Sequence, residues 1–456
     1  MLGGVKKLIP KSVFDFFAPI YHAALAYAGA VLYGFPSRSM KVIGVTGTKG
    51  KSTVTYLISK ILEANGDGVA AIGSLGYKIK NKEWPNTLKM TMPGRFKLQK
   101  FLYEAKRAGC KYVVLEVTSE GIKQRRHLGI KFDCAVFTNL HKEHLESHGS
   151  FENYYKAKQE LFRLTPNIHV VNADDPNIEL FSKFPSRQTI FYGVKGGDIR
   201  AVDLSVKRDK SSFNVFGTDF HINFGGEFNI LNALAALAVA AMYKVDLPNA
   251  KPILESIKSI PGRMEFIQLE PFNVVVDYAH TSESLIRVYQ TLGNSKLDRD
   301  SRLHTGTFSE QTLNSKQTQN DKTQNSKPRL ICVLGAAGGG RDKWKRPEFG
   351  RIAAEYCDEI ILTDEDPYDE NPDEILNQIE SGFSSQTLNS KLETLNYTKI
   401  LDRREAIKIA LTLAKEGDTV IVTGKGSETS MAVAGGKKIP WSDKDIVREL
   451  LNSPKN

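Results

Sequence analysis

Residues 42–53 constrain the fold of this chain more than any other stretch. They read VIGVTGTKGKST, which is an apolar strand, a glycine-rich loop and the start of a helix. Glycines let backbone N–H groups turn toward an anion, and the helix that follows presents its positive N-terminus. Lys51 can contact the β- and γ-phosphates of a nucleotide, and the Ser52 hydroxyl can bind Mg²⁺. The spacing is not the standard G-x-x-x-x-G-K-[ST], because Val45 stands at the first glycine position. A purely structural glycine turn is the alternative, but Gly-Lys-Ser-Thr at a strand-to-helix junction favours a phosphate site.

Apolar runs alternate with segments of helical periodicity from residue 41 onward. This pattern predicts an α/β fold with two parallel sheets covered by helices. The expected architecture is a central P-loop-type domain at 41–262 that binds ATP and a Rossmann-like C-terminal domain at 263–456, preceded by an apolar helical segment at 1–40. Pro261-Gly262-Arg263 would join the two domains. Expected strands are 42–46, 69–73, 112–117, 134–138, 168–172, 273–278, 329–334, 359–363 and 419–423. Expected helices are 52–64, 94–108, 151–163, 229–243, 282–293, 347–357, 372–381, 403–416 and 443–452.

Two polar segments interrupt the second series. Residues 294–327 are rich in Asn, Gln, Thr, Ser and Lys, and the hexapeptide QTLNSK at 311–316 returns at 386–391. Segments without large apolar residues cannot form a core, so we expect disordered surface loops, with an insertion at about 294–328. An ordered binding loop is the alternative.

The charge balance and the N-terminus limit the partners. The chain has 62 Lys and Arg against 52 Asp and Glu, a net charge of +10. Because no dense Lys/Arg run dominates, anionic small substrates are favoured over nucleic acid. Lys6, Lys7 and Lys11 precede an apolar run at 16–35, which lacks a secretory cleavage pattern. That run could pack on the next domain, lie at a membrane surface or span a bilayer.

The four cysteines are widely spaced and form no C-x-x-C motif. We expect buried, reduced thiols and a cytoplasmic protein, with membrane association through residues 1–40 left open.

Polar residues follow several of the expected strands. Glu116 ends a strand beside the phosphate loop, where a carboxylate can hold Mg²⁺. His144 lies among three histidines within eight residues, but their spacing matches no standard zinc site. Asp277 and His280 end a strand of the second series, and two cationic glycine turns, 338–343 and 424–428, suggest a pocket for a carboxylate or phosphate. Lys158 lies on a helix, and spacing alone does not separate it from Lys156.

Taken together, these motifs make the chain resemble the Mur ligase family, nearest to the branch that adds the third amino acid to UDP-N-acetylmuramoyl-L-alanyl-D-glutamate. The resemblance covers about residues 41–452. The matching motifs are 46–53, 91–93, 116–119, 137–140, 157–158, 172–175, 228–233, 261–265, 277–281, 341–343, 402–403 and 424–426.

The resemblance implies a role for each matching position. The cofactors would be ATP and Mg²⁺, and the catalytic residues would be Lys51, Glu116, His144 and Lys158. Lys158 falls on the family's carbamylated lysine, which with Ser52, Glu116 and His144 would hold metal. ATP would contact Gly47, Thr48, Lys49, Gly50, Lys51, Ser52, Thr53, Asn229, Asn232, Arg263, Asp277 and His280. The muramoyl-dipeptide would contact Thr91, Thr118, Gln124 and Arg126, and the incoming amino acid Arg341, Gly424 and Glu428.

The implied reaction proceeds through an acyl phosphate. The acceptor carboxylate attacks the γ-phosphate of ATP, and the amine of the amino acid then displaces phosphate from the acyl carbon. The partners would be a muramoyl-peptide acceptor and a free amino acid, and the protein is expected to be a monomer.

Three departures from the family pattern bear on the substrates. Forty apolar residues stand where the family has a uridine-nucleotide domain, so a lipid-linked acceptor is a hypothesis beside a UDP-linked one. Glu365-Asp366-Pro367-Tyr368 replaces the Asp-Asn-Pro-Arg of diaminopimelate-adding members, which favours an amine-bearing side chain such as lysine or ornithine. Gly426-Ser427-Glu428 replaces Gly-His-Glu, and Thr91-Met92-Pro93 replaces Thr-Thr-Pro.

Two rival functions share parts of this pattern. Folylpolyglutamate, cyanophycin and poly-γ-glutamate synthases have the same kind of ATP site, whereas Thr118, Gln124 and Arg126 favour a muramoyl-peptide. A nucleotide-binding protein without catalysis would have little use for Lys51, Ser52, Glu116, His144 and Lys158 together.

Overall fold

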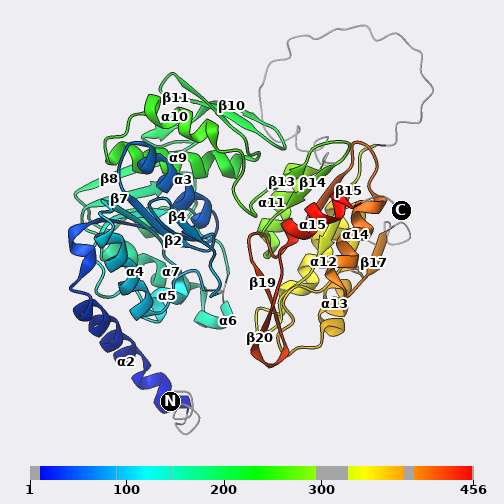
Figure 1. Cartoon of the computed structure of the whole chain (residues 1–456), viewed down its shortest axis with the longest axis horizontal. Helices are drawn as coiled ribbons and strands as arrows, with labels where there is room; N and C mark the ends of the chain where they lie inside the picture. Colours follow the sequence, from blue (N-terminus) through cyan, green and yellow to red (C-terminus); the bar gives the residue numbers. More distant parts are fainter. Residues whose placement is uncertain (1–10, 89, 144, 294–326, 385–394, 454–456) are drawn as a thin grey trace. The chain divides into compact units, whose positions relative to one another are not determined.

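The computed structural model describes residues 11–88, 90–143, 145–293, 327–384 and 395–453. The chain forms two compact units (Figure 1). The first contains Met1–Arg263 with the short segments Ser427–Met431 and Ile439–Ser442, and the second contains Met264–Gly426, Ala432–Lys438 and Asp443–Asn456. The change of unit along the main chain follows Arg263, one residue after the domain boundary predicted above.

A nine-stranded sheet forms the centre of the first unit, in the order β4-β3-β2-β5-β1-β6-β7-β8-β9. Strands β2 and β5 to β9 are joined in parallel around β1, and β3 and β4 form an antiparallel edge. The strands are β1 (Lys41–Thr46), β2 (Val69–Gly73), β3 (Gly76–Ile79), β4 (Lys82–Trp84), β5 (Tyr112–Glu116), β6 (Phe132–Phe137), β7 (Ile168–Asn172), β8 (Gln188–Gly193) and β9 (Ile199–Arg200).

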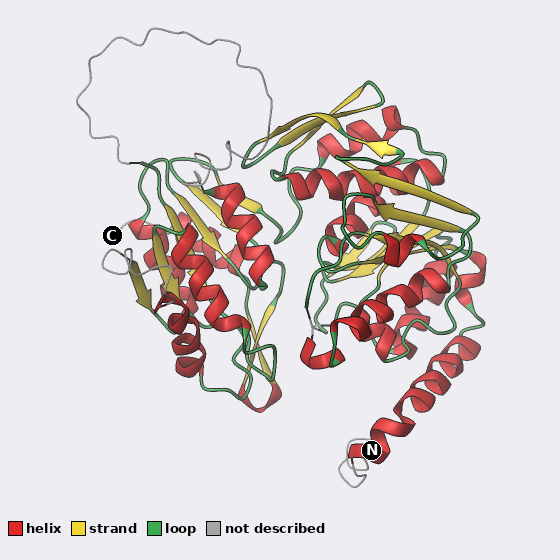
Figure 2. Cartoon of the chain, turned by 180° about the vertical axis from the view of Figure 1, so that it is seen from behind, coloured by secondary structure: helices red, strands yellow, loops and turns green. Residues whose placement is uncertain are grey.

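Helices cover both faces of this sheet (Figure 2). Alternate residues of a strand point to opposite faces, so Ile43 of β1 packs in one apolar cluster and Val42 in the other. Helices α3 and α9 pack in the first cluster, and helices α4 and α7 pack in the second. The helices are α2 (Lys11–Leu32), α3 (Lys51–Ala64), α4 (Arg95–Arg107), α5 (Ser119–Lys123), α6 (Leu145–His148), α7 (Phe151–Arg163), α8 (Glu179–Ser182), α9 (Glu227–Met242) and α10 (Leu247–Ser256). A separate antiparallel sheet contains β10 (Val202–Val206), β11 (Ser211–Val215) and β12 (Thr218–Ile222).

The second unit has a six-stranded sheet in the order β13-β14-β18-β15-β16-β17, parallel except for β13. Its strands are β13 (Glu265–Gln268), β14 (Asn273–Val276), β15 (Leu330–Leu334), β16 (Glu359–Leu362), β17 (Asn396–Lys399) and β18 (Thr419–Val422). Its helices are α11 (Ser282–Leu292), α12 (Lys345–Tyr356), α13 (Pro372–Glu380), α14 (Arg403–Leu413) and α15 (Asp443–Asn452). A two-stranded sheet joins β19 (Ser430–Val433) to β20 (Lys437–Pro440), and 3-10 turns occur at Pro36–Ser39, Ser381–Ser384 and Ala434–Gly436.

The predicted α/β class is therefore confirmed, and each expected strand and helix has a counterpart in the structure. The sequence patterns missed the strands β3, β4, β8, β9, β13 and β17, the β10–β12 sheet, the β19–β20 pair and the short helices α5, α6, α8 and α10. Of the polar segments predicted to be loops, 294–327 and 386–391, all residues but Lys327 lie outside the described residues.

The prediction of four reduced thiols is wrong for one pair. Cys332 and Cys357 form a disulfide with Cα atoms 6.2 Å apart, whereas Cys110 and Cys134 are free and buried. Cys332 lies on β15 and Cys357 is the C-cap of α12. Because α12 returns along the sheet after β15, residues 25 apart in sequence meet in space, which spacing alone does not reveal.

Helix α2 packs on α4 through its small residues Ala26, Gly29 and Ala30, which are buried. A Cβ added at Gly29 would lie 3.5 Å from both Phe96 and Gln99 of α4. Among the described helices, none combines the length and the apolarity needed to cross a bilayer.

Candidate active site

The glycine-rich loop lies between β1 and α3, as the sequence predicted. Gly47 and Gly50 have φ values of 144° and 81°, a region that favours glycine. A Cβ added at Gly47 would lie 1.9 Å from the Thr138 hydroxyl oxygen, and one added at Gly50 would lie 2.3 Å from the Asn232 amide oxygen. Both positions therefore exclude a side chain. Gly50 is also the N-cap of α3, and because glycine has no side chain, no side-chain oxygen accepts a hydrogen bond from the first N–H groups of the helix. The first N–H groups of α3 therefore point into the loop, where an anion can accept their hydrogen bonds.

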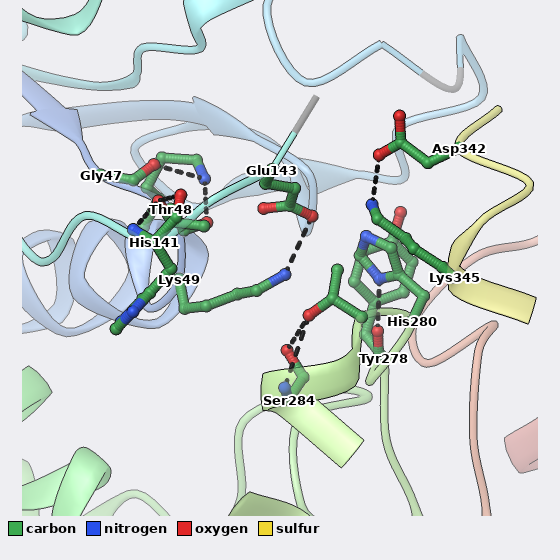
Figure 3. Close-up of polar contacts among 12 residues, drawn as sticks. Gly47, Thr48, Lys49, His141, Glu143, Tyr278, His280, Ser284, Asp342 and Lys345 are labelled. Carbon is green, nitrogen blue, oxygen red and sulfur yellow. Dashed lines mark hydrogen bonds and ion pairs between the residues drawn. The ribbon is translucent and has the colours of Figure 1, made fainter. Parts of the chain in front are cut away.

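The side chains of this loop are held by two neighbouring segments. Thr48 makes hydrogen bonds with the His141 backbone and, at 3.0 Å, with the Tyr154 hydroxyl. Lys49 forms an ion pair with Glu143 at 3.1 Å (Figure 3). Lys51 donates to the Gly47 and Thr48 carbonyls at 3.0 and 2.8 Å. The Lys51 ammonium therefore lies at the mouth of the loop, and Thr53 is buried behind it in α3.

Glu116 is the centre of a hydrogen-bond chain at the carboxyl ends of β1, β2 and β5. Its Oε1 accepts from Ser52 Oγ at 3.1 Å, and its Oε2 accepts from Ser74 N at 2.8 Å. Ser74 Oγ in turn shares a hydrogen bond of 2.8 Å with Thr91 Oγ1. Gly73 must be glycine here, because a Cβ would lie 2.5 Å from Glu116 Oε2. The sequence analysis identified Ser52, Glu116 and Thr91 but missed Ser74, which joins them; its position directly after a buried strand was the available signal.

The residues present fit Mg²⁺ bound to phosphates. Mg²⁺ prefers oxygen ligands, and proteins commonly supply one or two carboxylates while a nucleotide supplies the rest. Glu116 and Ser52 provide such oxygens, and both are buried. Within the described residues no cluster of three acidic, His or Cys side chains forms a complete metal cage. His144, the third predicted ligand, lies outside the described residues.

Lys158 is buried in α7 beside the phosphate loop, and its ammonium donates to the Gly47 carbonyl at 2.6 Å. It also lies 4.5 Å from the centre of the Tyr154 ring. Burial and the nearby Lys51 charge hold the pKa of Lys158 well below its ordinary value, against the opposing effect of Glu143 and Glu116. By contrast, Lys156 is exposed and pairs with Glu152. The structure therefore distinguishes the two lysines that spacing could not, and Tyr154 is a second neighbour that the sequence analysis missed.

Two residues predicted to contact ATP, Asn229 and Asn232, lie together at the start of α9. Asn229 Nδ2 donates to the Gly225 carbonyl at 2.8 Å, and Asn232 Nδ2 donates to Asn229 Oδ1 at 3.1 Å. Both are buried, and Asn232 approaches Gly50 of the phosphate loop. Arg263 also reaches the loop, with Nη2 3.5 Å from Ser52 Oγ.

The four residues predicted to contact the dipeptide divide into two kinds. Thr91 joins the Glu116 chain, and Arg126 donates to Gln124 Oε1 at 2.7 Å and to the Met92 carbonyl. Burial, and secondarily the charge of Arg95, lower the pKa of Arg126. Thr118 has a structural task, because its hydroxyl accepts from Gly121 N at 3.0 Å and caps α5. The hydroxyl of Thr118 is thus already engaged within the chain.

In the second unit, Asp277 and His280 follow β14. Asp277 accepts from the backbone of Met264 and of Ala279, each at 2.6 Å, which fixes the turn after the strand. His280 Nδ1 lies 2.6 Å from the Tyr278 carbonyl (Figure 3), and because a carbonyl only accepts, Nδ1 is the donor in this contact.

The residues predicted to recognise the amino acid follow β15, β16 and β18 of the same sheet. Arg341 donates to the Tyr368 hydroxyl at 3.4 Å and stands over its ring. Glu365 is buried against Gly424, where a Cβ would lie 2.4 Å from Glu365 Oε2. Asp366 is committed elsewhere, to an ion pair of 2.9 Å with buried Lys425 and to the Ala432 N–H. Glu428 lies in Ser427–Met431, a segment that groups with the first unit.

A cavity of about 330 Å³ adjoins the Glu116 corner. Its wall comes from α3 and the β3–β4 hairpin, and includes Ser52, Thr55, Tyr77, Trp84 and Glu116. Tyr77 and Trp84 stack with ring centres 5.8 Å apart. The cavity thus extends from Ser52 and Glu116 along one side of α3.

The family model of the Mur ligase middle domain matches residues 45–240, and that of the Mur ligase glutamate ligase domain matches residues 317–426. A UDP-N-acetylmuramyl-tripeptide synthetase of Roseiflexus sp. (strain RS-1) is 35% identical, over 95% of this chain and 82% of that protein. A UDP-N-acetylmuramoyl-L-alanyl-D-glutamate–2,6-diaminopimelate ligase of Syntrophomonas wolfei is 34% identical over the same shares.

Solved structures of several ligases share the fold of this chain. A UDP-N-acetylmuramoyl-L-alanyl-D-glutamate–2,6-diaminopimelate ligase aligns with a TM-score of 0.56 at 29% identity, over 91% of this chain and 78% of that one. The MurF ligase of Thermotoga maritima, solved with ADP, has a TM-score of 0.62 at 21% identity over 94% and 83%. A Mycobacterium tuberculosis folylpolyglutamate synthase has a TM-score of 0.66 at 16% identity over 95% and 96%, which reflects the shared fold alone.

Proposed function

This chain belongs to the Mur ligase family, and from that premise we propose that it is an ATP-dependent ligase that adds an amino acid to a muramoyl-dipeptide during peptidoglycan precursor synthesis. The observation that carries the proposal is the meeting of Lys51, Ser52, Glu116 and Lys158 at the carboxyl ends of one parallel sheet. Ligands of open α/β sheets bind at that edge. The acceptor is a UDP-linked muramoyl-dipeptide, as the names of the relatives indicate for those proteins, and a lipid-linked acceptor is the alternative that the assay below includes.

The proposed reaction has two steps. A carboxylate oxygen of the acceptor attacks the γ-phosphorus of ATP, the bond to the bridging oxygen breaks, and ADP leaves. The amine of the second substrate then attacks the acyl carbon, phosphate leaves, and the amine loses a proton. Lys51 and the N–H groups at the start of α3 stabilise the negative charge on the transferring group. Mg²⁺, held by Ser52 and Glu116, supplies further charge neutralisation when bound.

We propose that Lys158 is carbamylated. Only a neutral amine adds to CO₂, and the lowered pKa of Lys158 increases that fraction. Carbamylation replaces a buried cation by an anion close to Lys51, and its oxygens would be hard ligands for a second Mg²⁺. Mass spectrometry of the intact protein under bicarbonate, against the Lys158→Arg variant, tests this directly.

For the amino acid, we propose lysine or ornithine. Tyr368 stands where diaminopimelate-adding members have an arginine, so the second carboxylate of diaminopimelate has no such partner there. We propose that Glu365, which is buried beside Gly424, meets the terminal amine, whereas Asp366 is in an ion pair with Lys425. Arg341 would hold the α-carboxylate.

The test is phosphate release in a matrix of substrates. Purified protein, ATP and Mg²⁺ are combined with UDP-linked or lipid-linked muramoyl-dipeptide, and with lysine, ornithine, meso-diaminopimelate or glutamate. We expect turnover with an acceptor and a diamino acid together. No turnover with any pair, from protein that still binds ADP, would reject the ligase proposal.

A single substitution tests the specificity argument separately. Tyr368→Arg should raise kcat/KM for diaminopimelate and lower it for lysine, by about tenfold each for one gained or lost charged contact. Tyr397→Arg, at an exposed tyrosine of β17 in the same unit, is the matched control and should change neither value. Faster turnover of diaminopimelate than lysine by the natural protein would overturn the choice of amino acid while leaving the ligase proposal intact.

A further inference from the structure

The outward face of helix α2 is a continuous apolar surface. Its large exposed side chains are 38–68% accessible, and together with the exposed Ala24 and Ala28 they follow three- and four-residue spacings, which places them on one side of the helix. They are Phe17, Ile20, Tyr21, Tyr27, Val31 and Leu32. Between them only the small residues Ala24 and Ala28 are exposed on this side, and no charged residue occurs from Phe16 to Ser37 in the sequence. We call these six large side chains the α2 face.

The helix projects from its own unit rather than lying flat on it. Figures 1 and 2 both show α2 leaving the body of the first unit near α4 and ending at the N-terminus. Its inner side packs through Ala26, Gly29 and Ala30, so the contact with the protein is made by the small side chains and the large ones point away. This is the reverse of an ordinary surface helix, which buries its large apolar residues.

The neighbouring helix α4 presents cations. Lys97, Lys100, Lys106 and Arg107 are exposed on α4, against one exposed acidic residue, Glu104. Two exposed aromatic residues, Phe96 and Tyr103, continue the apolar surface onto this helix, and the rings of Tyr33 and Tyr103 lie 5.6 Å apart. Arg38, in the 3-10 turn Pro36–Ser39, is also exposed.

We propose that the α2 face docks on an anionic lipid surface. An apolar helix face rich in Phe, Tyr and aliphatic residues, flanked by Lys and Arg, is the combination that enters the headgroup boundary of such a membrane. The apolar side chains would insert, and the α4 cations would lie at the level of the lipid phosphates. Pairing with a second copy would instead bring the cationic α4 helices of two chains toward one another, which is unfavourable.

This inference goes beyond the ligase activity and does not rest on it. Docking would place the protein where a membrane-bound donor or acceptor of the same reaction sequence is found, but binding to lipid is measurable without turnover. Failure of the proposed ligase reaction therefore leaves the docking proposal standing, and the reverse is also true.

The test is co-sedimentation of the full chain with vesicles. We expect binding to vesicles of equal parts phosphatidylglycerol and phosphatidylcholine, and at least about tenfold weaker binding to phosphatidylcholine alone, because the α4 cations attract anionic headgroups. The double variant Ile20→Asp with Val31→Asp puts charge in the centre of the α2 face and should lose binding by at least about tenfold. The single variant Phe216→Asp, at a side chain 71% exposed in the β11–β12 turn, is the matched control and should bind as the natural chain does.

A second pair of variants tests the contribution of the α4 cations to lipid binding. Lys97→Gln with Lys106→Gln should weaken binding several-fold and reduce its dependence on salt. Lys207→Gln with Lys210→Gln removes the same charge from another exposed part of the first unit and should have no such effect. ADP binding, measured on every variant, checks that the phosphate loop remains folded.

Three results would overturn the proposal. The first is absence of binding to anionic vesicles by the natural chain. The second is binding that survives Ile20→Asp with Val31→Asp. The third is a dimer in analytical ultracentrifugation that this double variant converts to a monomer, which would assign the α2 face to a second copy.

Discussion

At the scale of single residues, the first unit contains a buried lysine whose charged form is destabilised by its burial. Lys158 has no ion pair among the described residues, and burial lowers its pKa. In the window between the lowered pKa and the ordinary value of 10.5, the unfolded chain binds the proton and the folded chain does not. Folding stability therefore rises with pH through that window, and below it the full cost of a buried cation remains.

We predict that Lys158→Met stabilises the protein and abolishes turnover. Measured on uncarbamylated protein in buffer free of CO₂, the gain should be about 1–2 kcal/mol at neutral pH, since a buried ammonium is replaced by an apolar chain of similar length, and it should shrink as pH rises toward 10.5. Denaturant unfolding across pH measures this. Lys156→Met, at the exposed lysine two residues earlier, should leave both stability and activity unchanged. A destabilised Lys158→Met variant would contradict the argument.

His127 should make the protein sensitive to acid. Burial lowers its pKa to about 4, and neither ring nitrogen has a hydrogen-bond partner in the described structure. Between about 4 and the ordinary 6.5 the unfolded chain is protonated while the folded chain is not, so stability falls as pH falls through this range, by up to about 3 kcal/mol.

The variant His127→Gln should flatten this acid dependence, and His221→Gln, at an exposed histidine, should leave it intact. The slope of unfolding free energy against pH is the measurement, because it is independent of any constant packing cost of the substitution. An unchanged slope in His127→Gln would show that other groups cause the acid sensitivity.

At the scale of elements, one helix of the second unit packs backbone to backbone. Gly350 lies inside α12, and a Cβ there would be 1.9 Å from the Ile379 carbonyl of α13. Helix propensity alone predicts that Gly350→Ala stabilises by about 1 kcal/mol. Because the close approach forces the helices apart, we predict a net loss of about 2 kcal/mol instead. Thermal unfolding checks this against Gly196→Ala, where open space surrounds the new Cβ and the change should be within about 0.5 kcal/mol.

The elements that the sequence predicted well are those with strong apolar patterns. The central parallel strands, such as β5 and β15, are buried on both faces and read as continuous apolar runs. Three of the missed strands lack that pattern, because β4, β10 and β17 are exposed throughout. Such strands form because neighbouring strands offer hydrogen bonds, which a residue pattern does not record.

The candidate site likewise contains residues that could be predicted from local sequence and residues that could not. Lys51, Ser52 and Glu116 could be predicted because the phosphate loop and the strand end are local in sequence. Ser74 and Tyr154 could not, because their contacts with Glu116 and Thr48 join residues 42 and 106 positions apart. Thr118 and Asp366 were predicted as substrate contacts, but their polar groups are used in a helix cap and an ion pair.

At the scale of the whole molecule, each unit has its own sheet and its own core, and only the second contains a disulfide. We predict two components in calorimetric unfolding. ADP with Mg²⁺ should raise the free energy of unfolding of the first unit by mass action, because the ligand binds the folded state. A reducing agent should lower the free energy of unfolding of the second unit by about 3–4 kcal/mol, the value expected for closing a 25-residue loop.

The double variant Cys332→Ala with Cys357→Ala is the control for the reducing agent. It should unfold like the reduced protein and show no further response, because Cys110 and Cys134 are free thiols. A single transition that ADP and reductant shift together would show that the two units unfold as one cooperative body.

The chain of hydrogen bonds from Ser52 through Glu116 and Ser74 to Thr91 has a thermodynamic consequence. Its four members connect the phosphate loop at one end with a residue assigned to the acceptor at the other. The Ser74 hydroxyl lies 3.4 Å from Glu116 Oε1 and 2.8 Å from Thr91 Oγ1, so a ligand that reorients Glu116 changes the hydrogen bonds open to the hydroxyl that contacts Thr91. Such linkage is reciprocal: whatever factor nucleotide binding contributes to acceptor affinity, acceptor binding contributes to nucleotide affinity. The order in which the two substrates arrive therefore cannot alter the total free energy, only the path by which it is reached.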